Sequence, residues 1–195
     1  MPRTFQRLAC LAAALVAAAC PSCARHAWPR REPLRAHYVM HDWYDDGFGG
    51  PVRLVIDLDR QRLTVYRSER EVGWCVVATG LEGHSTPAGN YRITEKVEDK
   101  YSTIYGVIKD AGGITINHDA RAGRDRVPPG GEFVPAPMPF WQRLTGYGIG
   151  MHGGPIPQPG EPASHGCIRM PFEFAPLLFD VTELGTPVKI VRHGY

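Results

Sequence analysis

The sequence predicts a mainly β domain with one short helix near its C-terminal end. Short runs of alternating apolar and polar residues recur along the chain, and turn-forming residues separate them. Only residues 171–180 space their apolar side chains as a helix does. About seven to nine strands with so little helix indicate the mainly β class. The 195 residues suit one such domain, and a hydrophobic content of 43% can supply its core.

Alternating segments fill the first half of this domain. Residues 52–58 and 62–67 predict the two strands of a hairpin, and 72–79 and 90–97 predict two further strands. The loop before the fourth strand contains the sequence TPAG at 86–89. This turn should be stiff, because proline fixes one dihedral angle and glycine permits a positive one.

The second half of the domain is less regular. We expect short strands in four places, 105–108, 113–116, 147–151 and 186–191. Residues 121–139 are rich in Arg, Gly and Pro and predict a long loop, and long loops in compact domains are usually functional. The aromatic residues that follow, Phe140 and Trp141, either line a cleft or pack in the core.

Residues 1–19 have the composition of a secretory signal, with two arginines, a short apolar run and small residues at the end. We therefore expect export to the periplasm or cell envelope. Cys20 follows the small residues directly and resembles the acylated cysteine of a bacterial lipoprotein, although Ala17 stands where leucine is usual. One lipid would tether the protein to a membrane surface, and cleavage without lipidation is the alternative. Residues 20–50 predict a linker to a domain at 51–195.

The charge of the chain argues against nucleic acid as a partner. The formal net charge is +2, and removing residues 1–19, with their two arginines and no acid, lowers it to 0. No basic cluster larger than Arg30-Arg31 occurs, whereas nucleic-acid sites are built on basic patches.

Two of the five cysteines, Cys75 and Cys167, lie in the predicted domain. Cys75 occupies an apolar, strand-like run, and we interpret it as a small core residue. Exported proteins can form disulfides, so a regulatory bond between Cys75 and Cys167 is an alternative. Such a bond would block the Cys167 thiol.

The stretch 151–171, MHGGPIPQPGEPASHGCIRMP, contains the residues with the most reactive chemistry. Cys167 has both His165 and His152 upstream of it in this stretch. A thiol is a strong nucleophile once a base takes its proton, and imidazole is such a base near neutral pH. Gly166 would let a substrate carbonyl approach, and free backbone N–H groups of a tight turn can bind an oxyanion. The pattern indicates nucleophilic acyl transfer.

Two other interpretations fit the same residues. Cys167 could be a buried structural thiol, since free cysteines are often interior. Cys167, His165 and His152 could instead bind zinc, because three protein ligands suffice for a catalytic metal site. We favour acyl transfer without a metal or other cofactor, because it also accounts for the flanking residues.

The sequences HGG at 152–154 and SHGCIRM at 164–170 resemble the signature of the L,D-transpeptidase catalytic domain, or YkuD family. The TPxG sequence at 86–89 is also typical of that family, at the mouth of its site. The resemblance extends over about residues 52–191. It implies a β-sandwich or mixed β-barrel-like fold with a short helix after the catalytic cysteine.

The resemblance implies roles for individual residues. Cys167 would be the nucleophile and His152 the base that takes its proton. Backbone N–H groups around His165 and Gly166 would form the oxyanion hole, with the His165 side chain shaping the site. The carbonyl of Gly153 would orient His152, since glycine offers no side chain for this purpose.

We also predict roles for two further residues of the motif. Ser164 should form hydrogen bonds within the catalytic loop. Arg169 carries a fixed positive charge that suits a carboxylate of the substrate, and a structural ion pair is the alternative.

The resemblance also implies a reaction. A peptidoglycan stem peptide would donate its acyl group to the cysteine, and the amine of another stem or of a protein would accept it. With water as acceptor, the same residues would make an L,D-carboxypeptidase or related hydrolase. A non-catalytic peptidoglycan-binding protein of the envelope is a further alternative.

Overall fold

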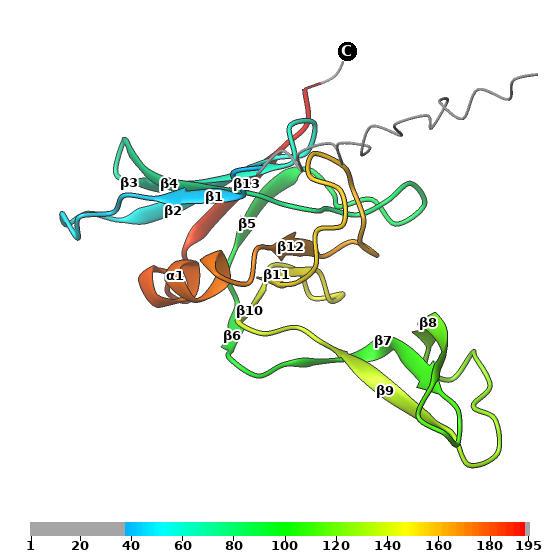
Figure 1. Ribbon diagram of the computed structural model, residues 1–195. Helices are drawn as coiled ribbons and strands as arrows, with labels where there is room; N and C mark the ends of the chain where they lie inside the picture. The colour runs from blue at the N-terminus through cyan, green and yellow to red at the C-terminus, as the bar shows by residue number, and fades with distance from the viewer. Residues whose placement is uncertain (1–37, 194–195) are drawn as a thin grey trace, which may run out of the picture. The chain divides into compact units, whose positions relative to one another are not determined.

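A computed structural model of the protein describes residues 38–193. The predicted signal, Cys20 and most of the predicted linker lie outside the described residues. The described part is mainly β with one α-helix, as the sequence predicted, and its three sheets are open rather than closed into a barrel (Figure 1). In this part of the chain, no helix is long and apolar enough to cross a membrane.

The largest sheet has six strands. They are β1 (His41–Trp43), β2 (Val52–Asp57), β3 (Arg62–Arg67), β4 (Arg70–Val76), β5 (Gly89–Arg92) and β13 (Pro187–Val191). Their order is β1-β4-β3-β2-β13-β5. β2, β3 and β4 form an antiparallel meander, and β13 pairs with β2 in parallel.

A second sheet and the helix carry the motif residues. The sheet contains β6 (Glu95–Val97), β10 (Trp141–Arg143), β11 (Gly150–Gly153) and β12 (Ile168–Met170), and the helix is α1 (Phe174–Val181). The strand order is β12-β11-β10-β6. One core joins both sheets and the helix, and its members include Leu54, Ile56, Leu63, Met151, Ile168, Met170, Phe174 and Leu178. Burying each such side chain contributes about 1.5–3 kcal/mol, which holds the short strands β11 and β12 in place.

The end of α1 is capped by a lysine from β6. Lys96 Nζ donates to the backbone oxygens of Phe179, at 2.6 Å, and Thr182, at 2.5 Å. The last carbonyls of a helix lack partners within the helix, and a cation is favourable there. This contact ties the second sheet to the helix that follows the cysteine motif.

The third sheet corrects our prediction of a long loop at 121–139. It contains β7 (Tyr101–Lys109), β8 (Thr115–Arg121) and β9 (Glu132–Pro137), in the order β8-β7-β9. β9 forms despite Pro135 and Pro137, because it is an edge strand. A proline at an edge costs no hydrogen bond of the ladder when its nitrogen faces outward.

Two other predicted strands differ from the structure. The strand expected at 90–97 is divided between β5 and β6, in different sheets, and the N–H groups of Ile93 and Thr94 bond outside both strands. The strand expected at 147–151 begins only at Gly150. The residues before it form a turn, in which the N–H of Thr145 donates to the carbonyl of Ile149.

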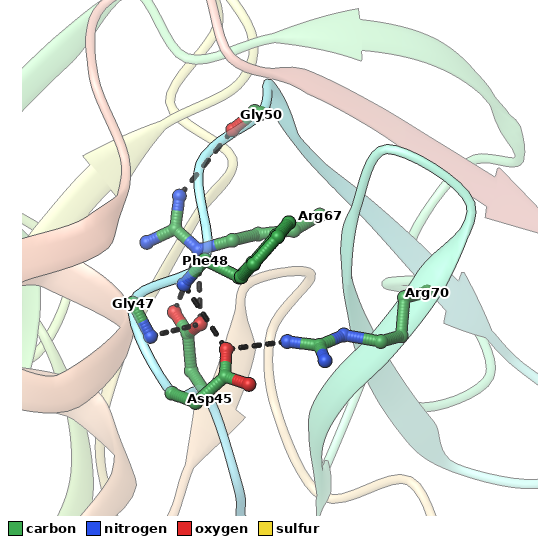
Figure 2. Close-up of polar contacts among 7 residues, drawn as sticks. Asp45, Gly47, Phe48, Gly50, Arg67 and Arg70 are labelled. Atoms are coloured by element: carbon green, nitrogen blue, oxygen red, sulfur yellow. Dashed lines mark hydrogen bonds and ion pairs between the residues drawn. The ribbon is translucent and has the colours of Figure 1, made fainter.

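The last part of the predicted linker, residues 38–50, packs against the domain. β1 pairs with β4, and the Trp43 ring lies 5.6 Å from the ring of Phe174. Asp45, with its side chain 4% exposed, accepts hydrogen bonds from Arg67 Nε, and Arg67 also donates to the carbonyl of Gly50 (Figure 2). No periodicity in the sequence indicates a structure for this segment, because contacts with residues distant in the sequence hold it.

Candidate active site

The parallel pairing of β11 and β12 brings the two halves of the sequence motif together. His152 pairs with Arg169 in this ladder, and Cys167 directly precedes β12. Side chains two residues apart on a strand share one face, as do direct partners on adjacent strands. Cys167, Arg169 and His152 therefore point to the same side of the sheet.

That side opens into a cavity of about 730 Å³. Cys167, His152 and Arg169 line it together with Ser164, His165 and Gly166. The segment Tyr101–Tyr105 of β7 contributes a further wall. This volume lies within the range of about 300–1,000 Å³ that is typical of small-ligand sites.

His152 is buried and held by the backbone of the next residue. Its Nδ1 lies 2.9 Å from the carbonyl oxygen of Gly153, the contact that the family resemblance implied. A carbonyl only accepts hydrogen bonds, so Nδ1 carries the proton and Nε2 presents a lone pair. Burial lowers the pKa of His152 to about 4, against the opposing effect of the Gly153 hydrogen bond. His152 is therefore a neutral imidazole at physiological pH.

Cys167 is half-buried, and its Sγ lies 3.7 Å from the carbonyl oxygen of Gly148. Burial raises the pKa of its thiol, and the backbone of Gly150 and the charges of Arg169 and Arg143 oppose that rise. The raised pKa of the thiol and the lowered pKa of His152 favour the neutral form of each group. Both side chains line the same cavity, and the thiol itself is directed at the Gly148 carbonyl.

The turn before Cys167 is fixed by two hydroxyl groups. Ser164 Oγ donates to the carbonyl of Cys167 at 2.5 Å and accepts from the N–H of Gly166 at 3.1 Å, so it bonds within the loop as expected. Thr86 Oγ1 donates to the carbonyl of Gly166 at 2.8 Å and accepts from the N–H of Gly80. Gly166 has φ of 114°, which favours glycine.

These bonds bear on the predicted oxyanion hole. The N–H of Gly166 already donates to Ser164, so it is not free for a substrate oxygen. The N–H of Cys167 is the better candidate, because it belongs to the nucleophile itself.

The His165 ring packs against the third sheet. It stacks on Tyr105, with centroids 4.3 Å apart, and its Nε2 lies 3.4 Å from Asp119 Oδ1. His84 meets the same ring edge-on and lines the cavity. This packing favours a shaping role for His165 over the role of base.

Arg169 enters the cavity from β12. Its aliphatic stem lies against Gly154, where an added Cβ would be 3.2 Å from Arg169 Cγ. This contact explains the second glycine of the HGG motif. The alternative of a structural ion pair finds no support, because none involving Arg169 forms within residues 38–193.

The zinc interpretation also finds no support in the geometry. Across the described range, no three His, Cys, Asp or Glu side chains are grouped closely enough to hold a metal ion. The His165 ring is instead stacked on Tyr105.

The sequence left open whether Trp141 lines a cleft or packs in the core, and the structure shows both. Trp141 is buried, lines the cavity, and its ring lies 6.2 Å from that of His152. Sequence reasoning missed Arg143 and Tyr105, which also line the cavity. No local pattern identifies them, and the TPxG sequence was the only signal for Thr86.

Comparisons with known proteins give a family match and similar folds. The sequence matches the L,D-transpeptidase catalytic domain, YkuD, over residues 51–190. An L,D-transpeptidase from Mycobacterium smegmatis has a similar structure, with 21% identity, a TM-score of 0.56, and coverage of 73% of this chain and 59% of that one. A mutant L,D-transpeptidase of Enterococcus faecium has 22% identity, a TM-score of 0.54, and coverage of 72% and 50%. An L,D-transpeptidase in complex with imipenem has 22% identity, a TM-score of 0.53, and coverage of 73% and 60%. No curated protein matches the sequence.

The fold and the site define a mainly β domain in which a cysteine and a histidine face one cavity. Because the match covers residues 51–190, the chain belongs to the L,D-transpeptidase catalytic domain family. It spans between 50% and 60% of the length of these solved relatives.

Proposed function

We propose that the protein is an L,D-transpeptidase that transfers the acyl group of a peptidoglycan stem peptide to an amine through a thioester on Cys167. The observation that carries this proposal is the parallel pairing of β11 and β12, which sets His152 and Cys167 on one face of the sheet. The neutral state of His152, whose pKa is lowered to about 4 by burial, supports its role as base.

The proposed reaction has two halves. His152 Nε2 takes the proton of the Cys167 thiol while sulfur attacks a peptide carbonyl of the donor stem. The tetrahedral oxyanion accepts a hydrogen bond from the Cys167 N–H. The C–N bond breaks, the leaving amine takes the proton from His152, and a thioester remains. An acceptor amine then attacks the thioester, gives its proton to His152, and releases the cross-linked product and the thiol.

The acceptor decides between related activities. The amine of a second stem would give a cross-linked wall, and the amine of a protein would attach that protein to the wall. Water in the same place would make the protein an L,D-carboxypeptidase or related hydrolase. A peptidoglycan-binding protein without activity would leave the stems unchanged.

Mass spectrometry of purified muropeptides incubated with the protein separates these outcomes. Cross-linked dimers, absent with Cys167→Ala, are the result that we expect. Shortened monomers would indicate hydrolysis, and unchanged muropeptides that still bind would indicate a binding protein.

We also propose that the protein works in the periplasm or cell envelope, because its substrate lies there and residues 1–19 resemble a secretory signal. Lipidation of Cys20 would anchor it to a membrane surface. Metabolic labelling with a fatty-acid analogue should mark the wild type and not Cys20→Ala. An intact leader on cytoplasmic protein would contradict export.

A further inference from the structure

The cavity around Cys167 is lined by side chains of one charge sign. Among the described residues that line it, Lys100, Arg121, Arg143 and Arg169 are cationic, and none is Asp or Glu. Low-dielectric walls of a single sign raise the local concentration of ligands with the opposite charge. The cavity is therefore suited to an anionic ligand.

Arg143 is fixed by an acidic residue outside the cavity lining. It lies on β10, directly opposite Glu95 of β6, and its Nε is 2.6 Å from Glu95 Oε2. The same carboxylate accepts the indole N–H of Trp141 at 3.0 Å and lies 3.5 Å from Lys100 Nζ. In the described residues, Glu95 is the only side chain to which Arg143 donates. Its terminal nitrogens thus stay available on a guanidinium whose orientation is set.

Arg169 differs in having no acidic partner in the described part of the chain. Burial lowers the pKa of its guanidinium, and the charges of Cys167 and Asp119 oppose that fall. A half-buried cation that no carboxylate contacts directly costs free energy unless a ligand supplies such a contact.

Both guanidinium groups line the same cavity as the nucleophile. Their charges also oppose the rise that burial causes in the pKa of Cys167. A peptide whose carbonyl reaches Cys167 would therefore lie in the cavity that both arginines line.

We propose that Arg143 and Arg169 each bind one carboxylate of the stem peptide, and that the site thereby selects stems with free carboxyl groups over stems with amidated ones. A guanidinium matches the two oxygens of a carboxylate and binds them through paired, charge-assisted hydrogen bonds. A primary amide has no charge and only one acceptor oxygen, so it loses this interaction. Glu95 is a positioning residue that acts through Arg143.

Binding can be measured without turnover on the full chain carrying Cys167→Ala, which cannot be acylated. The probes are synthetic tetrapeptide stems that differ only in which single carboxyl group is converted to a primary amide. In calorimetric titrations, we expect the free acid to bind at least about tenfold more tightly than the two forms that are amidated at the carboxyl groups that the arginines bind. Equal affinities for acid and amides would overturn the proposal.

Substitutions in the same background assign the carboxylates. Arg143→Gln should abolish the preference at one carboxyl group and Arg169→Gln the preference at another, with affinity for the matching amide nearly unchanged. Glu95→Gln should weaken the Arg143-dependent preference and leave the other intact. Arg60→Gln, at a side chain 77% exposed and outside the cavity lining, should change neither. A uniform loss of affinity for every peptide would show a structural role and contradict the proposal.

A second substitution at Arg143 tests the proposal even if Arg143→Gln does not fold. If circular dichroism shows that Arg143→Gln is unfolded, Arg143→Lys keeps the charge but not the paired geometry. It should reduce the preference, and an unchanged preference would count against paired binding.

This inference rests on the proposed function, because it takes the ligand to be a stem peptide, but the two fail separately. Thioester formation on Cys167 tests the reaction alone. A protein that forms the thioester at equal rates from acid and amide would keep its function and lose the assigned role of the two arginines.

Discussion

His152 and Arg169 are direct partners in the parallel pairing of β11 and β12. This relationship sets a fixed positive charge beside the imidazole. Burial is the main reason that the pKa of His152 falls to about 4, and the charge of Arg169 adds to the fall. The pair thus keeps His152 in the neutral form, which is the form that can accept the thiol proton.

If His152 is the base, His152→Ala should slow acylation of Cys167 by about a hundredfold or more near neutral pH. The deficit should shrink as the pH rises from about 6 to 10, because the thiolate then forms without help. The rate of acylation by imipenem, which one solved relative holds in complex, provides the measurement.

His165→Ala is the matched control from the same motif. It removes the stacking on Tyr105 and the contact with Asp119, so we expect a smaller loss that does not depend on pH. A larger, pH-rescued defect in His165→Ala would exchange the two roles.

The lowered pKa of His152 also predicts a pH dependence of stability. The unfolded chain takes up a proton near pH 6.5, whereas the folded protein does so only near pH 4. The contribution of neutral His152 to the free energy of unfolding is therefore fully present above about pH 6.5 and is lost as the pH falls towards 4. Its size is roughly 3 kcal/mol of unfolding free energy.

Urea unfolding of the wild type and His152→Gln at several pH values checks this contribution. Other titrating groups cancel in the difference between the two proteins. The wild type should lose roughly 3 kcal/mol more than the variant between pH 7 and pH 4. Parallel pH curves would show that His152 is not buried as a neutral base.

Thr86 links two loops that are far apart in the sequence, because its hydroxyl bridges Gly80 N–H and the Gly166 carbonyl. Thr86→Val keeps the shape and removes the hydroxyl, so we expect a loss of about 1–3 kcal/mol in unfolding free energy. Acylation of Cys167 should slow as well, since the turn before it loosens. Thr86→Ser retains the hydroxyl, so it should keep most of the unfolding free energy and of the acylation rate. Equal losses in Thr86→Ser and Thr86→Val would contradict a role for the hydroxyl bridge.

The sequence predicted those parts of the protein that depend on residues close together in the chain. The alternation in 52–67 gave the β2–β3 hairpin, and the HGG and SHGCIRM motifs gave Cys167, His152 and the Gly153 contact. β9 was missed because its prolines argue against a strand, and only its edge position makes them harmless. Arg143 was missed because its orientation depends on Glu95, which is distant in the sequence and adjacent in the sheet.

The ion pair that holds residues 38–50 could not be predicted for the same reason, because its partners lie 22 residues apart in the sequence. Asp45 and Arg67 form an ion pair of which the side chains are 4% and 18% exposed. Asp45→Asn should lower the unfolding free energy by roughly 2–3 kcal/mol, because it leaves the arginine poorly compensated. Glu69→Gln, in a pair with side chains 37% and 93% exposed, should change it by about 0.5 kcal/mol or less. Equal effects in thermal or urea unfolding would show that the segment is not held by this pair.

Intact mass spectrometry after incubation with a synthetic tetrapeptide stem tests the central claim most directly. We expect an adduct with the mass of the stem minus its C-terminal residue, located on Cys167 by peptide mapping. The adduct should be absent from Cys167→Ala and present in Cys75→Ala, whose altered residue is buried in the core. No adduct on the wild type, or an adduct that persists in Cys167→Ala, would contradict the thioester mechanism.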